Sequence, residues 1–444
     1  MARPKVIFPE KGVAHEEIFK LMDEAKKDDI VWEEGRVWSL VYHAGEAHTE
    51  MLKKAYNMFF SKNALSPLAF PSLKKFETEV VSMTADLFNG DKKTCGSLTS
   101  GGTESIMMAI KTYRNWARKK FPDIKEPEMV LPSSAHPAFS KGAEYFCVKE
   151  VRVPVDEETH RADVEAMKEA ITDNTIVLVG SACDFPRGVV DPITELGEIA
   201  QEKGIGLHVD SCLGGFMLPF VRKLGYKIPD FDFSVPGVTS LSADVHKYGY
   251  AAKGASVILY KKDNIWKHQF TVLTDWSGGV YISTTMRGTR PGGAIAAAWA
   301  ALKSLGEDGY LKLAKTVMDT TKKLIKGIED IPELYILGDP VMSVFSFASK
   351  EIDVFALGDF LDKKGWHLDR IQFPSALHMM VNPHHAKIVD QFLKDLQEAV
   401  KLTKEGAEKP KDGTMAMYGM VASLPDRGKV KEFITRFLKD QYKV

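Results

Sequence analysis

Two lysines near the middle of the chain have the surroundings that amine chemistry requires. Lys247 and Lys253 stand six positions apart in LSADVHKYGYAAKGASVILY, at 241–260. A lysine at the end of a buried strand can form a Schiff base with an aldehyde, because burial or a neighbouring cation makes its amine less basic. A solvated charged turn would explain the same residues. The rest of the chain must decide between these two interpretations.

Three further features follow or precede expected strands. TSGGTES at 99–105 places two glycines before an expected helix, where backbone amides and the hydroxyl of Thr103 could hold an anion. His136 lies just after one strand, and Asp210 ends another, where a buried carboxylate needs a partner. Each feature alone also has a structural explanation: a helix cap, a packed histidine, or a capping aspartate.

Taken together, the four features match the contacts that pyridoxal 5′-phosphate needs. These contacts are a phosphate cradle, a ring partner, a carboxylate at the pyridine nitrogen and a Schiff-base lysine. A nucleotide site is not predicted, because neither a P-loop nor a GxGxxG motif is present. No metal site is predicted either, since the cysteines lack ligand spacing: Cys95, Cys147, Cys183 and Cys212.

The elements that must position these residues alternate between apolar strands and amphipathic helices. Strands are expected at 128–133, 148–155, 175–182, 204–210, 237–244 and 255–260. Helices are expected within 100–120 and at 137–146, 161–171 and 193–203. This alternation predicts βαβ units and a mostly parallel sheet with helices on both faces. In such sheets, ligand sites gather at the carboxyl ends of the strands.

The pattern changes towards both ends of the chain. Residues 13–60 are expected to be helical, and a long helix at 291–328 leads out of the α/β pattern. Strands with few helices follow it. We therefore expect three parts: a helical segment at 1–60, a large α/β domain at 61–310 and a small α+β domain at 311–444. His384 and His385 are expected to form the solvated start of a helix in the small domain.

Composition excludes several classes of function. The 59 basic and 60 acidic residues give a formal net charge of −1, which predicts no nucleic-acid partner. No uncharged apolar run reaches the roughly 18 residues of a membrane span, and the N-terminus has no signal-peptide core. Scattered cysteines favour a reducing compartment. We therefore expect a cytoplasmic protein without a transmembrane segment.

Several motifs closely resemble those of the sphingosine-1-phosphate lyases. These motifs are SGGTESI, HVDSCLGGF, LSADVHKYGYAAKGAS, TDWSGGVY and GTRPGG. The lyases are fold-type I pyridoxal-phosphate enzymes of the group II decarboxylase superfamily. The resemblance runs from 35–48 to MAMYGMV at 415–421. SGGTES and HVD with GGF are shared with glutamate and aromatic amino-acid decarboxylases, whereas HKYGYAAKG, DWSGGVY and RPGG are more specific to the lyases.

The resemblance implies a fold and a set of roles. The implied fold is that of the fold-type I transferases, with a large domain built on a mostly parallel sheet and a smaller C-terminal α+β domain. Lys247 would hold the cofactor as a Schiff base, Asp210 would pair with the pyridine nitrogen and His136 would stack on the ring. The residues implied at the cofactor phosphate are Gly102, Thr103, His246 and, from a second subunit, Thr289. Those implied at the substrate phosphate are Tyr42 and Lys253.

The implied reaction is the retro-aldol cleavage of a phosphorylated long-chain amino alcohol of the sphingosine 1-phosphate type. Its products are an aldehyde and phosphoethanolamine. The catalytic residues implied are Lys247, His246 and Asp210, and either Lys247 or His246 could carry the proton. Family members are dimers with sites at the interface, so a homodimer is implied as well. Eukaryotic members carry an N-terminal membrane anchor, whereas this protein is expected to be without one, as bacterial members are.

One departure from the family pattern leaves the substrate head group open. NALSPLAFPSL at 63–73 replaces NPLHPDIFPGL, so that Ser66 and Leu68 stand where the family has histidine and aspartate. That histidine is associated with the substrate phosphate.

Three alternatives remain from the sequence. The first is a lyase for a different amino alcohol. The second is amino-acid decarboxylation, a carboxy-lyase activity, which needs a cation facing the substrate carboxylate. The candidates for that cation are Arg187, Arg287 and Arg290. The third is an inactive scaffold, which the intact set of Lys247, Asp210 and His136 disfavours.

Overall fold

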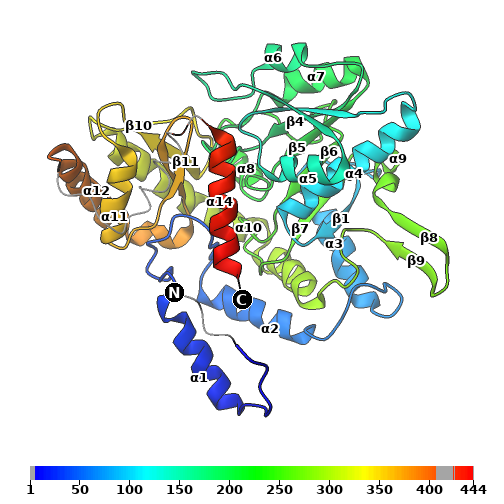
Figure 1. The fold of residues 1–444 in the computed structure, drawn as a ribbon, viewed down its shortest axis with the longest axis horizontal. Coiled ribbons are helices and arrows are strands. Elements are labelled where there is room, and N and C mark those ends of the chain that lie inside the picture. Colours follow the sequence, from blue (N-terminus) through cyan, green and yellow to red (C-terminus); the bar gives the residue numbers. More distant parts are fainter. Residues whose placement is uncertain (1–5, 407–423, 425, 444) are drawn as a thin grey trace.

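A seven-stranded sheet forms the centre of the protein in the computed structural model, which describes residues 6–406, 424 and 426–443 (Figure 1). The strand order is β1-β7-β6-β5-β4-β2-β3. The strands are β1 (Cys95–Thr99), β2 (Glu128–Pro132), β3 (Lys149–Val153), β4 (Thr175–Ser181), β5 (Gly206–Asp210), β6 (Ser240–Ala243) and β7 (Ser256–Tyr260). Strands β2 to β6 pair in parallel, whereas β7 is antiparallel to both β6 and β1. The predicted mostly parallel sheet is confirmed.

Helices cover both faces of this sheet, which explains why strands such as β4 and β7 are buried along their whole length and mainly apolar. The helices of the large domain are α3 (Pro71–Leu87), α4 (Gly102–Lys120), α5 (Ala138–Phe146), α6 (Val164–Glu169), α7 (Ile193–Lys203), α8 (Leu218–Lys223) and α9 (Asp263–Trp266). Met129 and Leu131 pack into one apolar core with α4 and α5, while Val130 between them packs into the core on the other face. Alternate residues of one strand therefore anchor both helix layers.

The N-terminal part differs from the expected continuous helix at 13–60. Helices α1 (His15–Ala25) and α2 (Glu46–Met58) form, with a short 3-10 turn after α1, but residues 29–45 are not helical. In this stretch Trp38 is fully buried, with its ring 4.3 Å from that of His385 and 6.2 Å from that of Trp366. An extended backbone delivers this indole to the C-terminal domain, and that packing outweighs local helix preference.

The C-terminal part contains the smaller sheet that was expected. Helix α10 (Gly292–Glu329) leads to it and is interrupted at Gly306, whose φ of 57° is non-helical. The sheet is antiparallel with the order β10-β11-β13-β12. Its strands are β10 (Tyr335–Ile336), β11 (Val344–Ala348), β12 (Asp369–Ile371) and β13 (Ala376–Met380). Helices α11 (Val354–Lys363), which the sequence pattern missed, α12 (Val389–Lys404) and α14 (Arg427–Tyr442) accompany it.

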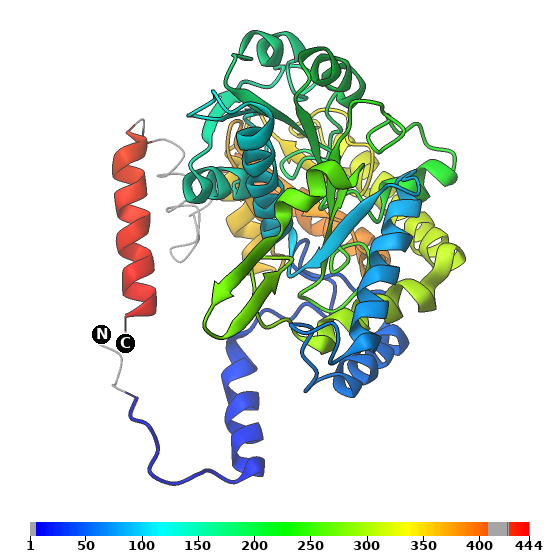
Figure 2. The same cartoon turned by 90° about the vertical axis from the view of Figure 1, so that its right-hand side faces the viewer.

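The predicted domain limits stay predictions, and the boundary at residue 310 falls inside α10. The motif MAMYGMV at 415–421 lies outside the described residues. None of the helices in the described ranges combines the length and apolar character that crossing a bilayer requires. A hairpin of β8 (Thr271–Trp276) and β9 (Gly279–Ser283) projects from the main body, and α14 lies at the edge of the molecule (Figure 2).

Candidate active site

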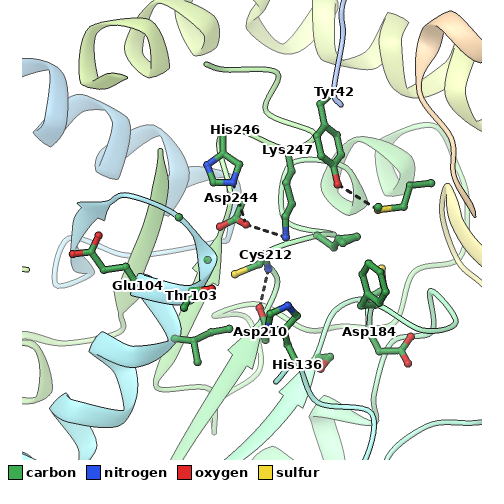
Figure 3. A pocket seen from close by; sticks show the side chains of 18 of the residues that line it. Tyr42, Thr103, Glu104, His136, Asp184, Asp210, Cys212, Asp244, His246 and Lys247 are labelled. Carbon is green, nitrogen blue, oxygen red and sulfur yellow. Dashed lines mark hydrogen bonds and ion pairs between the residues drawn. The ribbon is translucent and has the colours of Figure 1, made fainter. Parts of the chain in front are cut away.

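One cavity of about 520 Å³ lies at the carboxyl ends of the parallel strands. Strands β4, β5 and β6 end at Ser181, Asp210 and Ala243, and the loops that follow them carry the chemistry. The predicted residues that line this cavity are Tyr42, Gly102, Thr103, His136, Asp210, His246, Lys247 and Lys253. The structure therefore brings together residues separated by about 200 positions in the chain, as the topology of a parallel sheet requires (Figure 3).

Lys247 faces a buried carboxylate that sequence reasoning missed. Its Nζ lies 3.0 Å from Oδ2 of Asp244, and His246 Nε2 lies 3.7 Å from the same oxygen. Burial opposes a charge on Lys247, but the attraction of Asp244 outweighs it and raises the lysine pKa above its ordinary value. Burial likewise opposes the charge of Asp244, yet the attraction of Lys247 holds its pKa below the usual range. Asp244 follows β6 directly, much as Asp210 ends β5. This similar position at the end of a neighbouring strand is the sequence signal that could have identified Asp244.

The glycines at the start of α4 form a close-fitting cradle. A Cβ atom on Gly102 would lie 2.8 Å from Asp244 Oδ2 and 2.9 Å from Cys212 Sγ, so only glycine fits there. No side chain caps the helix at its N-cap residue Gly101, which excludes a cap at Ser100 or Thr103. The N-terminal amides of this 19-residue helix therefore stay available to an anion.

Two histidines border the cavity as neutral rings. Nδ1 of His136 accepts a hydrogen bond from the Ala138 amide (3.1 Å), and Nδ1 of His246 accepts one from the Ala255 amide (3.2 Å). Burial lowers the pKa of both imidazoles. With Nδ1 occupied as an acceptor, the proton of each neutral ring is on Nε2. His246 thus presents an N–H donor, which suits an anionic ligand.

Asp210 is fixed by hydrogen bonds on one of its two oxygens. Oδ1 accepts from the Cys212 amide (3.0 Å) and from Ser242 Oγ (3.2 Å). Behind it, His208 on β5 bonds to Ser240 Oγ through Nδ1 (2.8 Å), and burial lowers the pKa of this histidine to about 4. The neutral, hydrogen-bonded ring of His208 therefore lies next to the carboxylate on the same strand.

Tyr42 and Lys253 lie together at another part of the same cavity. Lys253 Nζ lies 4.8 Å from the centre of the Tyr42 ring and donates to the Leu40 carbonyl oxygen (2.9 Å). The Tyr42 hydroxyl donates to Met380 Sδ (3.3 Å). Desolvation and the nearby charge of Lys247 lower the pKa of Lys253 to about 8. Lys253 is thus a cation that titrates close to neutral pH.

Several predicted residues lie elsewhere. Thr289 is exposed, and its hydroxyl accepts a hydrogen bond from Asn63 Nδ2 (3.4 Å). Ser66 is also exposed and bonds locally to the Ala69 amide (3.3 Å). Neither lines the cavity of this chain. A residue supplied by a second subunit would lie outside the site of its own chain, so the role of Thr289 stays a prediction.

The three arginines considered for a substrate carboxylate are outside the cavity as well. Arg187 donates to the Phe373 carbonyl oxygen (2.6 Å), and Arg290 pairs with Glu77. Arg287 also lies outside. Among the described residues, no arginine lines the cavity, and the basic side chains that carry its positive charge are Lys247 and Lys253. A carboxylate substrate would therefore lack the guanidinium partner that planar bidentate recognition uses.

The donor set fits pyridoxal phosphate. The cradle of Gly102 offers helix amides, His246 offers an N–H group, and Asp210 offers a carboxylate for a ring nitrogen. Oδ1 of Asp244 is buried without a hydrogen-bond partner among the described residues, so this oxygen can still accept a hydrogen bond beside Lys247. In the same ranges, no group of three or more histidine, cysteine and acidic side chains is arranged to hold a metal ion.

Comparisons with known proteins agree with this geometry. The pyridoxal-dependent decarboxylase conserved domain matches residues 30–350. The chain is 46% identical to a sphingosine-1-phosphate lyase of Arabidopsis thaliana, over 98% of this chain and 81% of that protein. It is 44% identical to sphingosine-1-phosphate lyase 1 of Rattus norvegicus, over 98% and 76% of the two chains.

Solved structures give the same result for the fold. A sphingosine-1-phosphate lyase of Burkholderia pseudomallei superposes with a TM-score of 0.91 at 39% identity, covering 99% of this chain and 98% of that one. A glutamate decarboxylase of Lactobacillus brevis superposes with a TM-score of 0.79 at 19% identity, over 91% and 96%. The second similarity concerns the fold alone.

Proposed function

The chain belongs to the sphingosine-1-phosphate lyase family, and from this membership we propose the substrate, the residue roles and the assembly described below. It is a pyridoxal-phosphate-dependent carbon–carbon lyase of the fold-type I class. The reaction is the retro-aldol cleavage of a phosphorylated long-chain amino alcohol to an aldehyde and phosphoethanolamine. Full-length identity to lyases is the observation that carries this conclusion.

The predicted residues of the cavity divide the binding of the cofactor and of the substrate between them. Lys247 supplies the amine that binds the cofactor aldehyde, and Asp210 holds a proton at the ring nitrogen. His136 packs against the ring, while the amides at Gly102 and Nε2–H of His246 hold the phosphate. Pyridoxal phosphate, when bound, supplies an electron-poor ring that accepts the electron pair of the breaking carbon–carbon bond.

Lys247 is the better candidate for the proton carrier. The substrate hydroxyl must lose a proton to a base with a free lone pair. Nδ1 of His246 is occupied by the Ala255 amide, and its Nε2 bears the proton, so its neutral ring has no free lone pair towards the cavity. The amine of Lys247 has one as soon as it is unprotonated. Asp244, at 3.0 Å, then stabilises the ammonium that results.

Tyr42 and Lys253 select the phosphorylated end of the substrate. The ammonium of Lys253 provides the positive charge, and the ring of Tyr42, 4.8 Å away, holds it in place. Ser66 contributes nothing to this cavity within one chain, so Lys253 takes a larger share of phosphate binding than it would beside a histidine.

The functional form is a homodimer located in the cytoplasm. The β8–β9 hairpin exposes apolar side chains on its surface, with Val272 and Trp276 each 57% exposed and Val280 68% exposed. Clustered apolar side chains of this kind favour contact with another protein surface. Thr289, exposed close to the hairpin in sequence, could then reach the site of the second subunit. All cysteines are unpaired, which suits a reducing compartment.

A pair of assays tests the reaction. The purified protein, loaded with pyridoxal phosphate, is incubated with a phosphorylated long-chain 2-amino-1,3-diol and, separately, with amino acids. We expect the first incubation to release an aldehyde and the second to release no carbon dioxide. Lys247→Ala should release neither product. Carbon dioxide release would instead support the decarboxylase. Failure of the protein to take up pyridoxal phosphate at all would favour the scaffold.

A further inference from the structure

Glu104 is a buried acid beside the phosphate cradle that the reaction does not use. It lies in the first turn of α4 and is only 7% exposed. Although the residue borders the cavity, its carboxylate points away from Lys247 (Figure 3). It therefore cannot act on the reacting atoms directly. Its contacts instead lie behind the cradle.

One side of the Glu104 carboxylate fixes the cradle itself. Oε2 accepts two hydrogen bonds from Ser100, one from its amide and one from its hydroxyl, both at 2.6 Å. Ser100 directly precedes Gly101 and also lines the cavity. Because the backbone at Ser100 leads into the glycines, these two bonds restrict the direction in which the following amides point.

The other side of Glu104 holds a distant loop. Oε1 accepts a hydrogen bond from the Met286 amide (3.0 Å), 182 residues later in the chain. Arg287 Nε lies 3.8 Å from Oε2 and offsets the negative charge. A residue that only caps the helix would need the hydrogen bonds from Ser100, but it would not need the hydrogen bond from the Met286 amide.

The loop that Glu104 holds is also fastened at its far end. The Arg290 amide donates to Asn63 Oδ1 (3.2 Å), and the Gly292 amide donates to the Lys62 carbonyl oxygen (2.8 Å). Thr289 lies between the two attachments. Glu104 is thus the link between the cradle and the loop that presents Thr289.

We propose that Glu104 is a positioning residue for the cofactor phosphate, which ties Ser100 to Met286 so that the cradle and the loop at 284–290 keep one geometry. The proposal rests on the proposed function, because it assumes that the cradle holds pyridoxal phosphate. A carboxylate that receives three hydrogen bonds is well suited to the task, since bonds to a charged acceptor are stronger than neutral ones.

The test compares Glu104→Gln and Glu104→Ala with the wild-type protein and with a control, Glu50→Gln. Glu50 is an exposed acid on α2. Its ion-pair partner is Lys53, which is not part of the cradle. The affinity for pyridoxal phosphate is measured by titration of the visible absorbance, and hydrogen exchange is followed at the Ser100 and Met286 amides. We expect affinity to fall roughly tenfold to a hundredfold in both Glu104 variants and to stay unchanged in the control.

Hydrogen exchange at the two amides distinguishes a positioning role of Glu104 from a role in helix capping alone. We expect faster exchange at both Ser100 and Met286 in Glu104→Ala, because one side chain protects both amides. Faster exchange at Ser100 alone, or unchanged cofactor affinity in Glu104→Gln, would overturn the proposal. If Glu104→Ala does not fold, Glu104→Gln keeps the side-chain volume and decides the outcome through the same two measurements. Wild-type protein that takes up no pyridoxal phosphate would refute the proposed function instead.

Discussion

The amine nitrogen of Lys247 lies 3.0 Å from Oδ2 of Asp244, so the proposed Schiff-base lysine and its ion-pair partner share one short turn. The ion pair keeps the amine protonated, since Asp244 raises the Lys247 pKa despite burial. An ammonium has no lone pair and cannot attack an aldehyde. Uptake of the cofactor therefore depends on a proton leaving this pair.

Asp244→Asn should make the amine of Lys247 available at lower pH. Removal of the carboxylate takes away the strongest of the interactions that raise the lysine pKa, while burial still lowers it. We expect the midpoint of the pH profile for cofactor uptake to move down by about 1 to 3 pH units. Stopped-flow absorbance during addition of pyridoxal phosphate measures it. A midpoint that does not move would show that Asp244 does not set the charge of Lys247.

Substrate affinity should depend on the charge of Lys253. The pKa of Lys253 is lowered to about 8, so its ammonium is present below that pH and is lost above it. We expect kcat/KM for a phosphorylated amino alcohol to fall as the pH rises through about 8. In Lys253→Arg the fall should move to higher pH, because the guanidinium stays charged.

Lys253→Gln removes the cation at every pH. KM should rise roughly tenfold to a hundredfold at neutral pH while kcat changes little, because the interaction is the same in ground and transition states. Steady-state kinetics across the pH range check both variants. A wild-type kcat/KM that is flat through pH 8 would remove Lys253 from the phosphate site.

Asp210→Asn should separate cofactor binding from turnover. The amide cannot hold a positive charge at the ring nitrogen, whereas Lys247 and the cradle stay intact. We expect kcat to fall on the order of 10²–10³-fold with the cofactor still bound. Visible absorbance reports the cofactor and an aldehyde assay reports kcat. A kcat within a few-fold of wild type would show that another residue protonates the ring.

Trp38→Ala should destabilise the contact between the N-terminal segment and the small domain. The indole is fully buried between Trp366 and His385, and its removal leaves a large cavity. We expect a loss of about 3–5 kcal/mol in unfolding free energy. Urea unfolding monitored by circular dichroism measures it. The matched control is Trp276→Ala on the exposed β8–β9 hairpin, which should leave the monomer stability unchanged.

The sequence predicted the ends of the parallel strands well, and with them most of the named residues that line the cavity; their roles stay predictions. Apolar runs such as β4 and β5 are unambiguous because they are buried on both faces. Asp210 ends β5 and Lys247 follows the neighbouring parallel strand β6, so the two residues meet at one edge of the sheet. The antiparallel pairing of β7 with β1 was not predictable from the pattern, because short strands carry no mark of direction.

Burial of polar side chains was the harder feature to predict. His385, expected to be solvated, is fully buried, bonds to the Val37 carbonyl oxygen (3.0 Å), and has its pKa lowered to about 3 by burial. Its partner is 348 residues away, so no local pattern could reveal the contact. Glu104 and Asp244 were overlooked for a related reason, since their partners are defined by the fold.

Lys247 and Lys253 lie on the single connection between the neighbouring strands β6 and β7, at 244–255. The connection is closed by two hydrogen bonds between His246 and Ala255 and tightened by one from the Tyr250 amide to the Lys247 carbonyl oxygen. The backbone that carries the two proposed contacts, the Schiff-base amine of Lys247 and the phosphate-binding cation of Lys253, is therefore held in one conformation. With these proposed roles, the site would select a substrate by the separation of its amine and phosphate groups. The length of the hydrocarbon tail would not affect that selection.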